Sequence, residues 1–204
     1  MTKGAGRFFR GFAVRAPLVV GLLAACDGDA GPTSSLGERC GPYPSQQSSP
    51  YLLPYPAGMS WTVLQGNCTP GTHFAGGRDQ HAYDFAMPVG SPVVAARAGL
   101  VVEVEERYPD GNGAVDQSNY VAVQHDDGTL AVYFHLTQNG VLVELGRSVR
   151  QGEEIAASGV TGGTSTPHLH FGVIGGTGRT IAVTFRNTEP HPDGLQQGQT
   201  YPAF

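Results

Sequence analysis

Histidine and aspartate side chains in the central part of the chain are of the types that could bind a metal ion. The chain has seven histidines in 204 residues, and some of them combine a suitable ligand type with strand-like spacing. Zinc takes neutral imidazole nitrogens and carboxylate oxygens, and a catalytic zinc site keeps one position open for water. The candidate residues are His73, His81, Asp84, His135, His168 and His170.

The spacing of His168 and His170 places both imidazoles on one face of an expected strand over residues 168–173. Leu169 and Phe171 would then point to the opposite face. The alternative is a pair of surface histidines on an edge strand. The further motifs given below argue against this alternative, because their presence in the same chain would then be a coincidence.

His135 ends an expected hairpin that joins residues 120–125 to 130–135 through Asp126-Asp127-Gly128. Asp-Gly supplies the positive φ that tight hairpin turns need. Alternation places Leu130, Val132 and Phe134 on one face, which we assign to the core. His135 then faces away from the core together with Tyr133, which would line the site or, as is commoner for a strand aromatic, simply pack.

The rest of the chain indicates an all-β fold. It contains 30 glycines and 15 prolines, and only 14% of its residues are charged, which favours short strands and tight turns. Further valine-rich strands are expected at 92–96, 100–104 and 120–124, and no long amphipathic helix or repeat is present. A net charge of −5 and the lack of a basic stripe argue against nucleic acid as a partner.

The first 25 residues have the pattern of an export signal. Cationic residues precede an apolar run over 16–25 that is too short to span a bilayer. The run ends in Leu23-Ala24-Ala25-Cys26, which resembles a bacterial lipobox, so we expect lipidation of Cys26 and a membrane-anchored protein facing the periplasm or cell exterior. Ordinary signal cleavage nearby is the alternative. Residues 26–50 are rich in Gly, Ser, Pro and Gln and should form a flexible tether.

Cys40 and Cys68 remain as an even pair once Cys26 is set aside. Export implies an oxidising compartment, where a disulfide persists. We expect the two to pair, which would stabilise the fold by about 3 kcal/mol on the chain-entropy model. Two unpaired buried thiols are the alternative.

Three ordered motifs carry a family resemblance. They are Tyr83-Asp84-Phe85-Ala86-Met87-Pro88-Val89-Gly90-Ser91-Pro92-Val93, then Val132-Tyr133-Phe134-His135-Leu136, then Gly159-Val160-Thr161-Gly162 followed by Pro167-His168-Leu169-His170-Phe171. Together they resemble peptidase family M23, the lysostaphin-like or LytM-like zinc endopeptidases. The resemblance runs from about 51 to 173 and implies a sandwich-like catalytic domain of antiparallel sheets with a groove, here placed at 51–204 with a C-terminal extension.

The resemblance also assigns roles. It implies that Asp84 and His170 are zinc ligands and that His135 and His168 lie beside the attacking water. Many family members carry a histidine four residues before the aspartate, where this chain has Gln80. His73 and His81 are therefore the options for the first histidine ligand, and the subgroup that this chain resembles most favours His73.

The implied activity is zinc-dependent hydrolysis of peptide bonds in peptidoglycan. No helix with paired His and Glu is present, so the general base should be His135 or His168, and the other would stabilise the oxyanion. A non-catalytic wall-binding or amidase-activating protein of the same fold is the main alternative, and a hydrolase that processes a secreted protein is another. His125 and His191 are expected to be solvated or hydrogen-bonded only.

Overall fold

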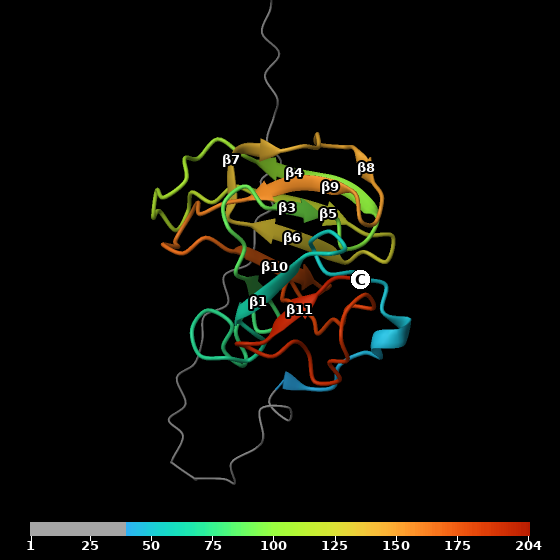
Figure 1. Cartoon of the computed structure of the whole chain (residues 1–204). Helices are drawn as coiled ribbons and strands as arrows, with labels where there is room; N and C mark the ends of the chain where they lie inside the picture. The colour runs from blue at the N-terminus through green and yellow to red at the C-terminus, as the bar shows by residue number, and fades with distance from the viewer. Residues whose placement is uncertain (1–39) are drawn as a thin grey trace, which may run out of the picture. The chain divides into compact units, whose positions relative to one another are not determined.

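The computed structural model describes residues 40–204, whose regular secondary structure is almost entirely β-strand (Figure 1). The predicted all-β fold with antiparallel sheets is confirmed. Within this range there is no helix of the length and apolar character needed to cross a bilayer. The expected signal peptide at 1–25 and the candidate lipidation site Cys26 lie outside the described residues.

Across residues 40–204, eleven strands form two sheets, of eight and three strands. The large sheet has the order β11-β1-β2-β10-β6-β5-β4-β8, and the small sheet has the order β3-β9-β7. In the described part of the chain, a short 3-10 helix, η1, precedes the strands. The bounds are η1 Gln46–Ser48, β1 Ser60–Gln65, β2 Tyr83–Phe85, β3 Pro92–Val94, β4 Gly99–Glu105, β5 Tyr120–Gln124, β6 Leu130–Phe134, β7 Leu136–Val141, β8 Ser148–Val149, β9 Glu154–Ser158, β10 Leu169–Ile174 and β11 Thr200–Pro202.

The predicted strands appear close to their expected positions. The hairpin of β5 and β6 is present, with Tyr120 opposite Phe134 and Gln124 opposite Leu130. Gly128 in its turn has a φ of 81°, the positive value that the Asp-Gly pair was expected to supply. The expected strand over 168–173 is β10, which begins one residue later.

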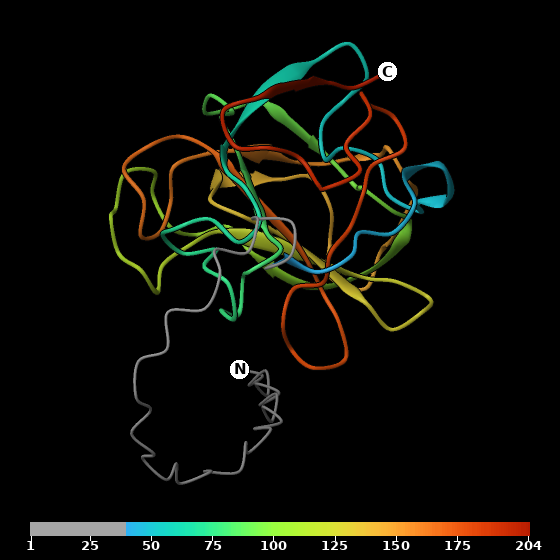
Figure 2. The same ribbon diagram turned by 90° about the horizontal axis from the view of Figure 1, so that it is seen from below.

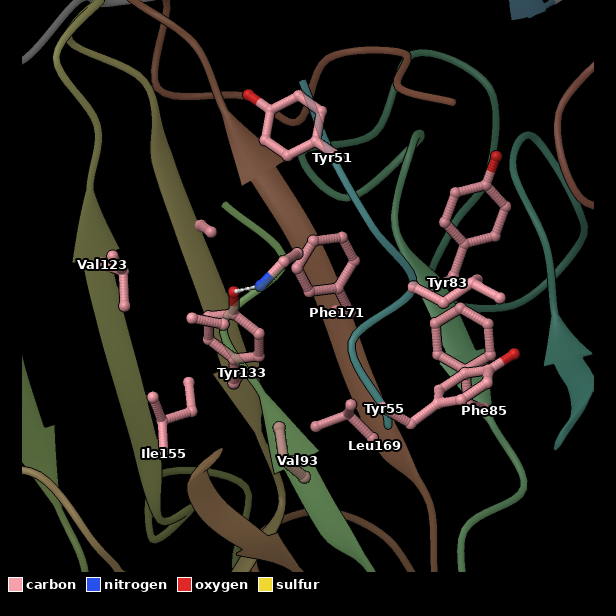
Figure 3. Close-up of a cluster of buried hydrophobic side chains, with 14 of the residues drawn as sticks. Tyr51, Tyr55, Tyr83, Phe85, Val93, Val123, Tyr133, Ile155, Leu169 and Phe171 are labelled. Carbon is pink, nitrogen blue, oxygen red and sulfur yellow. Dashed lines mark hydrogen bonds between the residues drawn. The ribbon is translucent and has the colours of Figure 1, made fainter. Parts of the chain in front are cut away.

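The hydrophobic core lies between the two sheets (Figure 3). Val93 of β3 and Ile155 of β9 meet Tyr133 and Leu169 of the large sheet, and all four are fully buried. The Tyr133 hydroxyl accepts a hydrogen bond from the backbone N–H of Ala96 at 2.8 Å, which joins the two layers. Because this face of the large sheet is covered, the opposite face of β10, β6 and β5 is left to form a surface.

The two faces of β6 are the reverse of our expectation. Ala131 and Tyr133 point into the core, whereas Leu130, Val132 and Phe134 line the opposite surface. The prediction failed because both faces of β6 are apolar, so alternation alone does not identify the buried one. Tyr133 accordingly has the packing role and does not line the site.

Residues 40–50, expected to belong to the tether, pack against the domain. The Cys40–Cys68 disulfide is present. The Gln46 side chain donates to the carbonyl of Thr188 at 2.9 Å, and the Ser49 hydroxyl donates to the carbonyl of Thr184. The folded domain therefore begins no later than Cys40, so the tether prediction is wrong for residues 40–50. Residues 26–39, the rest of the predicted tether, lie outside the described residues.

Candidate metal centre and groove

Asp84 and His170 are brought together by sheet register. They are direct partners in the pairing of β2 with β10, with Nδ1 of His170 2.9 Å from Oδ1 of Asp84. Their neighbours Phe85 and Leu169 are also paired and point into the core, so alternation sends both polar side chains to the opposite face.

His73 reaches the same point from the loop after β1. Its Nε2 atom lies 3.3 Å from Nδ1 of His170 and 3.5 Å from Oδ1 of Asp84, and the residue is fully buried. Its Nδ1 faces the carbonyl oxygen of Gly66 at 3.3 Å, so Nδ1 carries the hydrogen and Nε2 presents its lone pair. One donor atom from each of the three residues lies within 4.8 Å of the others.

His81 lies elsewhere. Its Nε2 is 3.0 Å from Nε2 of Gln80, and its ring sits edge-on to Tyr43 with 6.3 Å between centroids. Cys40 and Cys68 are close to it, but their sulfurs are joined in the disulfide and are not available as thiolate ligands. Of the two options left open by the sequence, the structure places His73 beside Asp84 and His170.

The charge balance of this cluster fits a divalent cation. Burial alone would raise the pKa of Asp84, but the hydrogen bond from His170 and the nearby imidazoles outweigh burial and lower it. Burial lowers the pKa of His73, which favours its neutral form. Across the described range, the ion-pair partners of Asp84 are imidazoles alone. Burial alone would lower the pKa of His170, but its hydrogen bond to Asp84 and the charge of that carboxylate raise it. Asp84 is thus the one carboxylate in a buried group of imidazoles, and two nitrogens with one oxygen form a donor set that zinc accepts.

His135 and His168 lie side by side at the edge of the cluster, with ring centroids 4.5 Å apart. Nδ1 of His168 is 2.8 Å from the carbonyl oxygen of Thr166, and its Nε2 is 3.7 Å from Oδ1 of Asp84. Nδ1 of His135 is 2.6 Å from the carbonyl oxygen of Thr161. Each carbonyl requires a hydrogen on Nδ1, so each neutral ring keeps an Nε2 lone pair that can accept a proton.

His135 reaches the site through an unusual backbone conformation. It lies between β6 and β7 with a φ of 63°, in the left-handed region that non-glycine residues seldom adopt. This break in alternation takes its ring away from the core face occupied by Tyr133. Burial, followed by the proximity of His168, lowers the pKa of His135 to about 4 and favours its neutral form near pH 7.

The glycine-rich turn over residues 159–163 supports His135. Gly162 has a φ of 86°, and a Cβ there would lie 2.8 Å from Cβ of Ser118 and 3.3 Å from Nδ1 of His135. Glycine thus allows the turn to deliver the Thr161 carbonyl to the imidazole. Figures 1 and 2 both show this turn beside the loop between β4 and β5, which contains Ser118.

A groove of about 680 Å³ runs across the exposed face of the large sheet and includes most of this cluster. Asp84, His135, His168 and His170 lie along it. The rest of its floor is formed by side chains that we had assigned to the core from the sequence or had not considered as part of a site. These are Ala122, Leu130, Val132, Phe134, Tyr120 and Glu103.

Comparison with known proteins gives the following similarities. Residues 78–182 match the family described as peptidase family M23. The chain is 38% identical over 91 residues to peptidoglycan DD-endopeptidase ShyA of Vibrio cholerae, a match covering 45% of this chain and 19% of ShyA. It is 35% identical over 88 residues to the uncharacterized lipoprotein YgeR of Escherichia coli, covering 43% of this chain and 32% of YgeR. A zinc-containing peptidase from Vibrio cholerae has 29% identity and a TM-score of 0.49, covering 65% of this chain and 39% of that structure.

Proposed function

The chain belongs to peptidase family M23, and on that basis we propose that it is a zinc metalloendopeptidase that hydrolyses peptide bonds in peptidoglycan. The observation that carries the proposal is the convergence of donor atoms from His73, Asp84 and His170. Asp84 and His170 also line the groove, and His73 is buried beside them. Sequence similarity to a peptidoglycan DD-endopeptidase supports the substrate class. The aligned part is a fifth of ShyA, so its activity is extended to this chain as part of the proposal.

We propose that His73 and His170 ligate zinc through Nε2 and Nδ1, with Asp84 as the carboxylate ligand. Bound there, zinc supplies Lewis-acid chemistry, since it polarises a peptide carbonyl and makes a water molecule more acidic. The carbonyl of Gly66 fixes the tautomer of His73 so that its lone pair is available.

In this proposal His168 and His135 move the protons. Either Nε2 can accept the proton of the attacking water, because Thr166 and Thr161 hold the hydrogens on Nδ1. The imidazolium formed can then donate a hydrogen bond to the developing oxyanion or protonate the leaving amine. The apolar floor beside them excludes water from one side of the substrate, which strengthens these interactions.

We propose that the protein is exported and anchored to a membrane through Cys26. The signal-like sequence at 1–25 and the lipobox-like Leu23-Ala24-Ala25-Cys26 support this proposal. Similarity to YgeR, a lipoprotein by name, supports it as well. An anchor would keep the groove within reach of the cell wall.

The second candidate is a non-catalytic wall-binding or amidase-activating protein. Non-catalytic relatives typically lose zinc ligands, whereas this chain keeps a full donor set and two flanking histidines. The intact set favours the enzyme. Hydrolysis of a secreted protein would use the same residues and differs only in the substrate.

Zinc content and hydrolysis of purified sacculi test the proposal on the full chain in detergent. We expect one zinc per chain, release of soluble muropeptides, loss of both on dialysis against a chelator, and recovery on zinc addition. Bound zinc with intact sacculi would refute wall hydrolysis. Stimulation of an added amidase in that case would establish the activating function, and cleavage of a denatured secreted protein would establish the other substrate.

A further inference from the structure

The floor of the groove carries an aromatic row that leads away from the metal centre. His170 is paired with Phe134 across β10 and β6, and Phe134 is paired with Tyr120 across β6 and β5. The ring centroids are 5.9 Å apart for the first pair and 4.9 Å for the second. A substrate lying across the sheet therefore passes over apolar and aromatic surface on its way from the histidines to β4.

A carboxylate stands where this row ends. Glu103 of β4 is exposed, lines the groove and is paired with Ala122 of β5. The Tyr120 hydroxyl donates to its Oε2 atom at 3.0 Å, which fixes the orientation of the carboxylate. Two residues further along β4, Glu105 pairs with Arg107 at 3.2 Å.

Glu103 has no such cation. The ion pairs within residues 40–204 use other acids, and none includes Glu103. An oriented carboxylate with no counter-charge beside an apolar floor has the features of a recognition site for an ammonium group, because the floor can receive the methylene stem while the carboxylate takes the charge.

We infer that Glu103, oriented by Tyr120, selects substrates that carry a free primary amino group on the side of the scissile bond lying over β5 and β4. This rests on the proposed function of the groove. Three strand spacings separate β10 from β4, which is about 14 Å. That distance corresponds to about four residues of extended peptide, or fewer when the amino group ends a long side chain.

The test uses two forms of one substrate, muropeptides with free amino groups and the same muropeptides after N-acetylation, which removes the charge. Wild-type protein should show a kcat/KM about 2- to 5-fold higher for the free amine, the range expected for an exposed charge pair. Glu103→Gln should hydrolyse both forms at the lower rate, with unchanged zinc content. Tyr120→Phe should lose part of the preference. Glu144→Gln, which removes an exposed acid outside the groove, should keep it.

An unchanged preference in Glu103→Gln would overturn the inference, as would equal hydrolysis of the two forms by the wild type. If the wild type hydrolyses neither form, the proposed function fails and the inference is decided by binding. The dissociation constants of the zinc-loaded protein for the two forms are then compared. Weaker binding of only the free amine by Glu103→Gln would support the ammonium site, and equal binding of both forms by the wild type would refute it.

Discussion

His170 and Asp84 face each other as direct partners in the pairing of β10 with β2, and Nδ1 of His170 lies 2.9 Å from Oδ1 of Asp84. Two donors of the candidate metal centre are thus fixed by the register of a central sheet. The third, His73, comes from a loop that the Cys68 disulfide holds to the N-terminal segment. The two parts of the centre should therefore respond differently to mutation.

Replacing His170 and His135 separates metal binding from proton transfer. His170→Ala removes a proposed ligand. Loss of a residue that only supports a ligand lowers metal affinity by about 10- to 100-fold, so we expect His170→Ala to weaken zinc affinity by more than about 100-fold. His135→Ala should retain zinc and lower kcat by about 10²- to 10⁴-fold. Zinc content by atomic emission and sacculus hydrolysis on the same samples distinguish the two. Full zinc and full activity in both variants would refute the site assignment.

His73 and His81 form a second matched pair. His73→Ala should lose zinc and activity, because Nε2 of His73 lies within 3.5 Å of Asp84. His81→Ala should keep both, since the His81 ring packs on Tyr43 and Gln80 outside the cluster. The measurement is zinc stoichiometry after gel filtration. Loss of zinc in His81→Ala alone would exchange the roles of the two residues.

The sequence predicted β3, β4, β5, β6 and β10, because each of these strands carries a local pattern, and it did not predict the other six strands of the described range. The alternation of His168, Leu169, His170 and Phe171 correctly separated groove face from core face, since polar and apolar side chains alternate there. The faces of β6 could not be predicted in the same way. Its groove face carries Phe134 and Val132, and apolar residues on a ligand-binding surface have the same pattern as a core. The left-handed conformation of His135 was also beyond prediction, because it depends on support from a turn 26 residues further along the chain.

Gly162→Ala should impair catalysis without loss of metal. The new Cβ would meet Ser118 and approach Nδ1 of His135, at a φ of 86° that costs alanine about 1 kcal/mol. We expect kcat to fall by at least about 10-fold, because the hydrogen bond from His135 to Thr161 would be displaced. Zinc content should be unchanged. Gly176→Ala is the control, because a Cβ there meets nothing within 4 Å and its φ is not positive. Equal kcat in the two variants would contradict the supporting role of Gly162.

Removal of the disulfide should affect both stability and metal binding. Cys40 and Cys68 are 28 residues apart, and on the chain-entropy model the double variant Cys40→Ser, Cys68→Ser should lose about 3 kcal/mol of unfolding free energy. The loop that carries His73 would also lose its anchor, so zinc affinity should fall by about 10-fold or more while the paired Asp84 and His170 stay in place. Urea unfolding and competition with a zinc indicator measure the two effects. Reduced stability with unchanged zinc affinity would show that the loop is held by other contacts.

Acid sensitivity should depend on His125, a buried residue far from the metal centre in the sequence. Burial, followed by the nearby Arg97, lowers the pKa of His125 to about 4, against about 6.5 for an unfolded chain. Its Nδ1 is 2.9 Å from the Thr129 hydroxyl, and its Nε2 is buried without a hydrogen-bond partner. Above pH 6.5 the ring is neutral in both states. As pH falls from 6.5 to 4, the unfolded chain takes up a proton that the folded protein does not, so the free energy of unfolding decreases, by about 3 kcal/mol for this group.

The variant His125→Asn removes this titration, so its free energy of unfolding should fall less steeply with decreasing pH than that of the wild type. Urea unfolding at several pH values between 6.5 and 4.5 measures the two slopes. The difference between them isolates His125, because the other buried histidines, including those of the metal centre, are common to both proteins. Parallel curves would mean that His125 takes up a proton equally in both states, which its buried position beside Arg97 argues against.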